Sequence, residues 1–166
     1  RHPGMSDMEW QCRNWYYFTW LSGDHVVEMH IHSIDVINWV LDAHPIRAEG
    51  VGGRQQRVDP SYGHIFDHLG IEFEYPDGQR VTCMQRQMAG SSGVWTENVI
   101  GSEGSADLMN HKIEGATNWS FDEENPPNAY VQEHADLIDS ILSEDPINEG
   151  KRVAESTLTA IMADRK

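Results

Sequence analysis

The sequence predicts an α+β fold with an open-faced, largely antiparallel sheet that is covered by helices on one face. A segment with helical periodicity near the N-terminus is followed by several short strand-like segments joined by tight turns, and helical periodicity then returns. Strands joined by hairpins pair antiparallel, and helices that are segregated from them pack together on one face. The length of 166 residues predicts a single domain, 1–166.

The first helix is predicted over residues 25–41, from an apolar stripe at helical spacing. The stripe consists of Val27, Ile31, Ile34, Ile37 and Leu41. Asp24 is its predicted N-cap, because aspartate side chains accept hydrogen bonds from the free amides of a first helical turn. The aromatic-rich residues 1–24 are predicted to form a short helix or an irregular packed arm.

Period-two segments and turn residues define the sheet. Pro76-Asp77-Gly78 is typical of a hairpin turn, since proline fixes φ and glycine accepts positive φ. Gly50, Gly52 and Gly53 in the first strand indicate a bulge or bend. The predicted strands cover residues 46–56, 65–75, 80–88, 94–100, 105–109 and 112–121.

Two closing helices are predicted after Asn125-Pro126-Pro127, over residues 130–142 and then from the cap residue Asn148. The uncovered second face of the sheet must be polar or buried by a partner. We therefore expect a homodimer or a higher oligomer. The candidates for this second face are Ile65, Val81, Val94 and Trp95.

Composition excludes some partners. The 12 basic and 27 acidic residues give a net charge of −15, which repels nucleic acid and anionic membranes. No apolar run reaches the length of about 18 residues that a membrane span needs. Cys12 and Cys83 are expected to be free, mostly buried thiols. We expect a cytoplasmic protein, and we expect both ends to be cuts in a longer one, which leaves an upstream export signal open.

The densest cluster of chemically active side chains lies at the start of the first helix. A helical wheel at about 100° per residue places Glu28, His32, Asp35 and Trp39 on one face. A carboxylate four residues before an imidazole orients the ring and raises its pKa, which is typical of an acid/base unit. The alternative is an ordinary surface pair, worth a few tenths of a kcal/mol. His30 lies away from this pair.

Other sites have weaker support. Neither HExxH nor HxxEH is present, although His25, Glu28, His30 and His32 are all ligand types, and we expect no bound metal. His64 and His68 are predicted on one face of a strand, with Asp67 on the other. No GxSxG motif or P-loop occurs, and the glycines of residues 50–53 precede no predicted helix, so the dinucleotide fingerprint is absent.

The segment Gly23–Trp39 resembles the helix that opens the second domain of the Gfo/Idh/MocA oxidoreductases. Glu28 matches the acidic position of that helix, His32 its histidine and Asp35 its aspartate. Further segments resemble the family's first long hairpin, its glycine turn and its closing helices, so the resemblance covers nearly the whole chain. These segments are residues 63–78, 99–104 and 133–150.

This resemblance implies the C-terminal, substrate-side domain of a two-domain enzyme whose N-terminal Rossmann domain is absent here. It implies His32 as the acid/base at a substrate hydroxyl and Glu28 as its orienting or substrate-binding partner. Asp35 and His30 are further substrate-binding candidates. Glu28 stands where aspartate is commoner, and His30 stands where glycine is frequent. The family's partner lysine lies in the Rossmann domain.

The implied function is substrate binding in an NAD(P)-dependent oxidoreductase that acts on a sugar, a polyol or a related hydroxy compound. NAD or NADP is expected in the full-length protein, with none bound to this chain alone, which is expected to be inactive. The open sheet face is implied as the oligomer interface. Two alternatives are a non-catalytic binding or assembly module of the same fold and a metal-dependent hydrolase that uses His64, His68 or His30.

Overall fold

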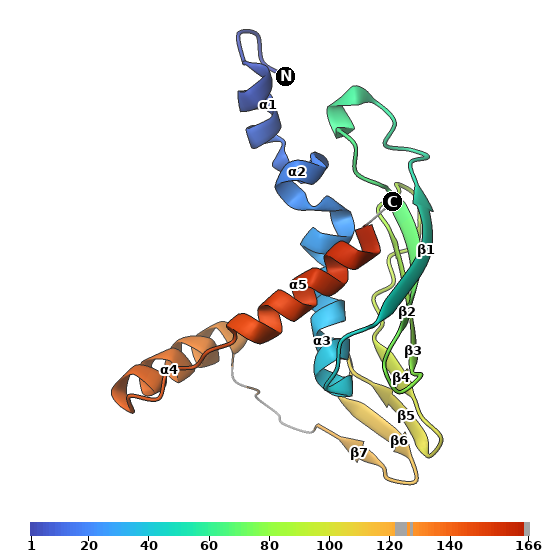
Figure 1. Ribbon diagram of the computed structural model, residues 1–166, viewed down its shortest axis with the longest axis vertical. Coiled ribbons are helices and arrows are strands. Elements are labelled where there is room, and N and C mark those ends of the chain that lie inside the picture. The colour runs from blue at the N-terminus through green and yellow to red at the C-terminus, as the bar shows by residue number, and fades with distance from the viewer. Residues whose placement is uncertain (122–125, 127, 165–166) are drawn as a thin grey trace. The chain divides into compact units, whose positions relative to one another are not determined.

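The chain forms two compact units, residues 1–91 with the C-terminal helix and residues 92–149. The computed structural model describes residues 1–121, 126 and 128–164 (Figure 1). Each unit contains helix and an antiparallel sheet, of three strands in the first and four in the second. The predicted α+β class is therefore confirmed.

The aromatic-rich N-terminal segment is helical. It contains α1 (Asp7–Arg13), a 3-10 turn (Trp15–Tyr17) and α2 (Thr19–Ser22). Ser6 precedes α1, and its hydroxyl accepts a hydrogen bond from the Glu9 amide at 3.2 Å, so the helix has a serine N-cap. Of the two predicted descriptions, the short helix is the better one.

The helix predicted over residues 25–41 exists, but it begins with a π-turn (Val26–His30) before α3 (Ile31–Leu41). Asp24 is not a conventional N-cap. Its backbone is left-handed, with φ +71°, and its carboxylate accepts hydrogen bonds from the amides of His25 at 2.6 Å and Phe66 at 3.1 Å. The fully buried carboxylate thus joins the helix start to a distant loop.

The first unit contains a three-stranded antiparallel sheet of β1 (Arg47–Gly53), β2 (His68–Glu74) and β3 (Arg80–Arg86), in that order. The pairing of β1 with β2 runs without interruption, so the predicted bulge is absent. Glycine instead permits close approach, because a Cβ at Gly50 would lie 2.7 Å from the carbonyl oxygen of Gly70.

The turn between β2 and β3 is confirmed. Gly78 has φ +85°, and its amide donates to the Tyr75 carbonyl at 3.0 Å. The start of β2 was predicted wrongly, because residues 64–67 form a loop and the strand begins at His68. His64 and Asp67 therefore do not occupy the predicted strand faces. The His64 amide donates to the Tyr17 carbonyl at 3.0 Å instead.

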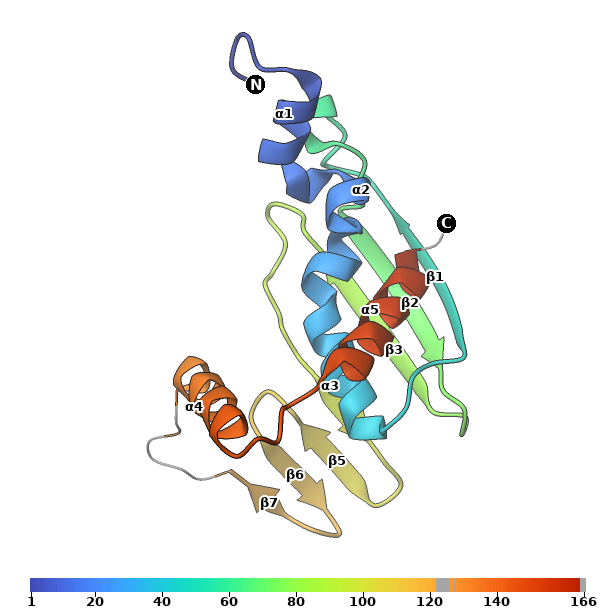
Figure 2. The ribbon, with the colours of Figure 1, turned by 60° about the vertical axis from the view of Figure 1, so that its left-hand side comes forward.

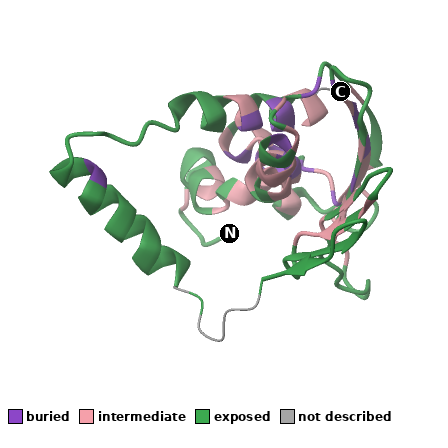
Figure 3. Cartoon of the chain, turned by 90° about the horizontal axis from the view of Figure 1, so that it is seen from below, coloured by how far each residue is buried: buried purple, intermediate pink, exposed green. Residues whose placement is uncertain are grey.

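Two helices cover one face of this sheet, as predicted: α3 and α5 (Gly150–Asp164) (Figure 2). Tyr75 joins sheet and helix, because its buried hydroxyl donates to Oδ1 of Asn38 on α3 at 2.7 Å. The buried residues gather between these helices and the sheet (Figure 3). The core consists of Val26, Ile34, Ile71, Phe73, Tyr75, Cys83 and Ala160.

The other face of this sheet carries charged side chains. Arg80 forms ion pairs with Glu72 at 2.7 Å and with Glu74 at 3.3 Å. Ile65 and Val81 were predicted on this face and are on the core side. Ile65 is fully buried before β2 begins, and Val81 pairs with Phe73 and packs against the core.

The second unit contains four short antiparallel strands in sequential order and α4 (Ala129–Leu142). Val94 and Trp95, also expected in a sheet face, are exposed and precede the first of these strands. Asn128 caps α4 by accepting the Tyr130 amide at 2.9 Å. The predicted break at residues 125–127 lies outside the described residues except for Pro126. The strands are β4 (Asn98–Ile100), β5 (Gly104–Asp107), β6 (Lys112–Gly115) and β7 (Trp119–Ser120).

Both cysteines are free thiols; Cys83 is buried, whereas Cys12 is exposed, contrary to the expectation for Cys12. Among the described residues, no helix combines the length and the apolar character that crossing a membrane requires.

Candidate functional site

The predicted site residues lie where the helix changes from π to α geometry. Glu28 and His30 belong to the π-turn, and His32 is the second residue of α3. A π-turn holds i→i+5 hydrogen bonds, so residues four apart are no longer stacked as on an α-helix, and such turns are frequent at functional sites. The wheel that paired Glu28 with His32 assumed α geometry throughout.

Glu28 and His32 differ in their surroundings. His32 is exposed, whereas Glu28 is half-buried. Oε2 of Glu28 is buried without a hydrogen-bond partner in the described part of the chain, His32 included. The structure therefore places the two side chains one helical turn apart without joining them through this oxygen. His30, half-buried, completes the π-turn.

Asp35 is held by α5. Its Oδ1 accepts a hydrogen bond from the Ser156 hydroxyl at 2.6 Å, and its Oδ2 accepts one from Nη1 of Arg152 at 3.1 Å. The carboxylate thus links the two helices that cover the sheet. These contacts give Asp35 a structural role that the sequence pattern did not predict.

Glu28 belongs to a polar cluster that sequence reasoning missed. We define the polar cluster as Tyr16, His25, Glu28, Gln85 and Gln87. Tyr16 contacts the ring of His25 edge-on, with centroids 6.2 Å apart, and its hydroxyl accepts a hydrogen bond from Nε2 of Gln87 at 3.0 Å. Three further buried atoms lack hydrogen-bond partners: Oε1 and Nε2 of Gln85 and Oε1 of Gln87.

The sequence contains a signal for this cluster. Inward-facing residues of β3 alternate, so Val81 and Cys83 face the core and Gln85 follows in the same series. Gln87, two residues further, continues it. The inward-facing residues of this segment thus change from apolar to amide side chains. This change marks the end of the apolar core along β3.

Burial sets the protonation of the cluster. It lowers the pKa of His25, although a side-chain contact with Gln85, which falls short of hydrogen-bond geometry, and the charges of Asp24 and Glu28 oppose this shift. Burial, helped by the charge of Glu28, raises the pKa of Tyr16 to about 12 against the opposing hydrogen bond from Gln87. Near pH 7 His25 is therefore neutral and Tyr16 keeps its proton.

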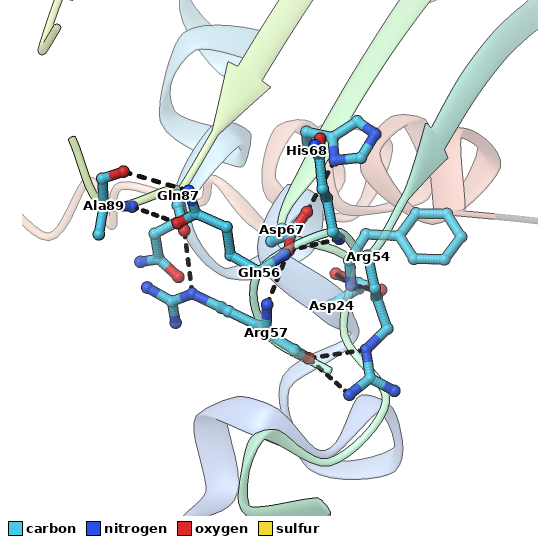
Figure 4. Close-up of polar contacts among 10 residues, drawn as sticks. Asp24, Arg54, Gln56, Arg57, Asp67, His68, Gln87 and Ala89 are labelled. Atoms are coloured by element: carbon cyan, nitrogen blue, oxygen red, sulfur yellow. Dashed lines mark hydrogen bonds and ion pairs between the residues drawn. The ribbon is translucent and has the colours of Figure 1, made fainter. Parts of the chain in front are cut away.

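A second carboxylate fixes the loop beside the cluster (Figure 4). Oδ2 of the buried Asp67 accepts the backbone amides of residues 55, 56 and 57 at 2.8, 2.7 and 2.9 Å. This places Arg57, whose Nε donates to the Gln87 carbonyl at 2.9 Å and whose Nη1 donates to the Tyr17 hydroxyl at 3.2 Å. Asp67 thereby positions the strand end that carries Gln87.

The glycine-rich strand does not form a dinucleotide-binding turn. The glycine-rich β1 pairs antiparallel with β2 and is followed by a 3-10 turn (Pro60–Tyr62), so the strand–glycine turn–helix arrangement that binds a pyrophosphate is not formed. A hollow of about 360 Å³ between β1 and the end of α5 contains none of the predicted site residues.

The metal-dependent alternative has no ligand set in the described residues. They contain no group of three or more His, Cys, Asp or Glu side chains arranged to hold an ion. The ring of His64 packs edge-on against Phe18, and Nδ1 of His68 contacts Oδ1 of Asp67 at 2.7 Å. His64 and His68, two of the three histidines named for a hydrolase, are thus engaged within the fold.

The fold is similar to about half of several solved structures. Aldose-aldose oxidoreductase from Caulobacter crescentus, solved with glycerol, matches with a TM-score of 0.67 and 17% identity, over 89% of this chain and 47% of its own. UDP-N-acetylglucosamine 3-dehydrogenase GnnA from Acidithiobacillus ferrooxidans matches with a TM-score of 0.68 and 16% identity, over 85% and 46%. GenD2 from gentamicin A biosynthesis, solved with NAD, matches with 0.61 and 18%, over 90% and 48%.

The chain thus spans about half the length of the solved structures it matches. At the level of fold, this confirms the resemblance to the Gfo/Idh/MocA oxidoreductases. No protein-family model matches the sequence, and no curated protein matches it.

Proposed function

We propose that this chain is the substrate-side part of an NAD(P)-dependent oxidoreductase that acts on a sugar, a polyol or a related hydroxy compound. The observation that carries the proposal is the Glu28 carboxylate, which has a buried oxygen without a partner at a π-turn. Burying a charged acceptor unpaired is costly, so its retention favours a functional role. The matched oxidoreductases support the same assignment.

In this proposal His32, Glu28 and His30 act on the substrate, and Asp35 supports them. His32 moves the proton of the reacting hydroxyl, for which its exposed imidazole is accessible. Glu28 accepts a hydrogen bond from a substrate hydroxyl, and His30 contributes to the same wall. Asp35 acts by fixing α3 against α5. Hydride chemistry belongs to a nicotinamide held by a separate Rossmann domain.

The second candidate is a non-catalytic binding module of the same fold. The observation that favours it is that Asp35, a predicted substrate-binding residue, is held by Ser156 and Arg152 of α5 and so supports the fold. The module and the enzyme part bind similar ligands, but only the enzyme part turns them over.

Titration calorimetry with NAD, NADH, NADP and NADPH tests the proposal, on this chain and on the full-length protein. We expect binding to the full-length protein only. If neither this chain nor the full-length protein binds a nicotinamide nucleotide, the oxidoreductase proposal is excluded and the non-catalytic module is the remaining candidate.

Self-association through the outer face of β1–β3 is part of the proposal. Val51 and Met84 are exposed there, at 81% and 79%, beside the ion-paired end of the sheet. We expect at least a dimer by light scattering at micromolar concentration, and a monomer would count against this interface.

A further inference from the structure

Four buried polar atoms without partners occur together in the polar cluster, and they carry the inference. They are Oε2 of Glu28, Oε1 and Nε2 of Gln85, and Oε1 of Gln87. Folded proteins leave few buried polar atoms unsatisfied, because each loses its bonds to water without replacement. These four are the only such side-chain atoms in the described chain, and they belong to three neighbouring side chains.

Most of these atoms are hydrogen-bond acceptors. Three are acceptors and one is a donor group. Glu28 adds a negative charge, while His25 is neutral because burial lowers its pKa. The charge of Arg57 acts on both His25 and Tyr16, and its guanidinium donates to the Gln87 carbonyl and the Tyr17 hydroxyl. The cluster therefore favours a ligand that donates several hydrogen bonds and carries no negative charge.

We propose that Tyr16, Gln85 and Gln87 are substrate-binding residues of the same site as Glu28, and that the cluster selects an uncharged polyhydroxy compound over its phosphorylated or carboxylated forms. This assignment rests on the proposed function. It adds the residues that form hydrogen bonds with the hydroxyl groups of the substrate. Hydroxyl groups of such a ligand donate to the three free acceptors and accept from Nε2 of Gln85.

Access to the cluster depends on Tyr16. The four atoms have almost no surface open to solvent in the free chain. Tyr16 contacts His25 with its ring and Gln87 with its hydroxyl, and it stands in a single 3-10 turn between two short helices. Rotation of this side chain breaks one hydrogen bond of the cluster and the edge-on ring contacts with Trp15, Tyr17 and His25, and we expect a ligand to displace Tyr16 in this way.

The test uses a substitution with opposite expected effects on stability and on binding. Gln85→Met keeps the length of the side chain and removes two buried polar atoms that lack partners. The midpoint of thermal unfolding should stay equal or rise, because no satisfied hydrogen bond is lost. Affinity for D-glucose by titration calorimetry should fall by about tenfold or more, because each lost bond of this kind weakens binding by that order. Gln79→Met, on the exposed turn, is the matched control and should change neither quantity.

The probes are D-glucose, D-xylose and myo-inositol, each uncharged, with D-glucose 6-phosphate and D-glucuronate as the matched anions. We expect the wild-type chain to bind at least one neutral probe and to bind both anions more weakly than D-glucose. Tighter binding of an anion, no binding of any neutral probe, or unchanged affinity in Gln85→Met would each overturn the inference.

These outcomes separate this inference from the proposed function. If Gln85→Met no longer binds the neutral probes and the full-length protein binds no nicotinamide nucleotide, the binding site is supported and the oxidoreductase proposal is excluded. If turnover is lost in His32→Ala but turnover and affinity are unchanged in Gln85→Met, the oxidoreductase proposal is supported and the proposed binding role of Gln85 is excluded. A lowered unfolding midpoint in Gln85→Met would show that Gln85 supports the fold, and it would overturn the assignment too.

Discussion

The hydroxyl of Ser156 on α5 donates a 2.6 Å hydrogen bond to Oδ1 of Asp35 on α3. Ser156 is buried, and Asp35 also accepts from Arg152 at 3.1 Å. A hydrogen bond to a charged group contributes about 1.5–3 kcal/mol. This contact therefore has a large share in holding the two helices together.

Asp35→Ala should lower the free energy of unfolding by about 2 kcal/mol, measured by urea denaturation. Arg152→Ala is the control, because its side chain is 44% exposed and surface ion pairs are worth at most about 1 kcal/mol. Equal stability of Asp35→Ala and wild type would contradict the structural role and return Asp35 to the substrate-binding candidates.

Asp67→Asn should destabilise the chain in a pH-dependent way. Burial acts to raise the pKa of Asp67, but the hydrogen bonds from the Arg57 amide, His68 and the amides of Gln56 and Gln55 outweigh it and hold the pKa well below 3.8. The ionised carboxylate therefore contributes stability that is fully present above about pH 4 and is lost as the pH falls through the folded pKa.

Urea denaturation of wild type and Asp67→Asn from pH 7 to pH 2 measures this effect. We expect a difference of about 2 kcal/mol or more at pH 7 that shrinks below pH 4. Asp77→Asn, on the exposed hairpin turn, should give a small and flat difference. A difference for Asp67→Asn that does not change with pH would rule out the charged interaction.

Gly63→Ala should be strongly destabilising. Gly63 has φ +56°, and an added Cβ would lie 1.9 Å from the Tyr17 carbonyl oxygen. Strain and clash together should cost about 3 kcal/mol or more. Gly78→Ala shares the positive φ, at +85°, but meets no atom within 4 Å, and should cost about 1 kcal/mol. Similar costs at both positions would mean that the loop moves freely away from Tyr17.

His32→Ala in the full-length protein should lower turnover by about 10² or more, because general acid–base catalysis contributes that order. His44→Ala is the control, since His44 is also exposed but lies beyond the end of α3. Steady-state rates on the substrate found by a sugar and polyol screen provide the measurement. A wild-type rate for His32→Ala would exclude the acid/base role.

The fold was predictable because local patterns and tertiary packing agree along most of the chain. The apolar stripe that contains Ile34 faces the core, and the Pro76–Gly78 turn joins β2 to β3. One error occurred where a side chain overrides the local pattern, because Asp67 accepts the amides of the neighbouring loop and β2 begins only after it. The error at Val81 has another cause: the strand register, which places Val81 opposite Phe73, was not known from the sequence.

The candidate site was less predictable than the fold. A helical wheel has no means of anticipating a π-turn, since such turns depend on tertiary contacts rather than on apolar periodicity. The other members of the polar cluster include Tyr16, near the N-terminus, and Gln85 and Gln87, at the end of β3. No local sequence pattern connects residues that are so far apart in the chain. The two glutamines that follow the apolar, inward-facing residues of β3 could have indicated part of the cluster.

The π-turn at residues 26–30 makes the separation of Glu28 and His32 sensitive to chain length. A π-turn is equivalent to one extra residue in an α-helix, and each residue turns the helix by about 100°. Deleting a single residue there would turn His25 and Glu28 about the helix axis relative to His32, and it would also turn Val26, which is buried in the core. A change in the length of this turn is therefore coupled to the packing of the core.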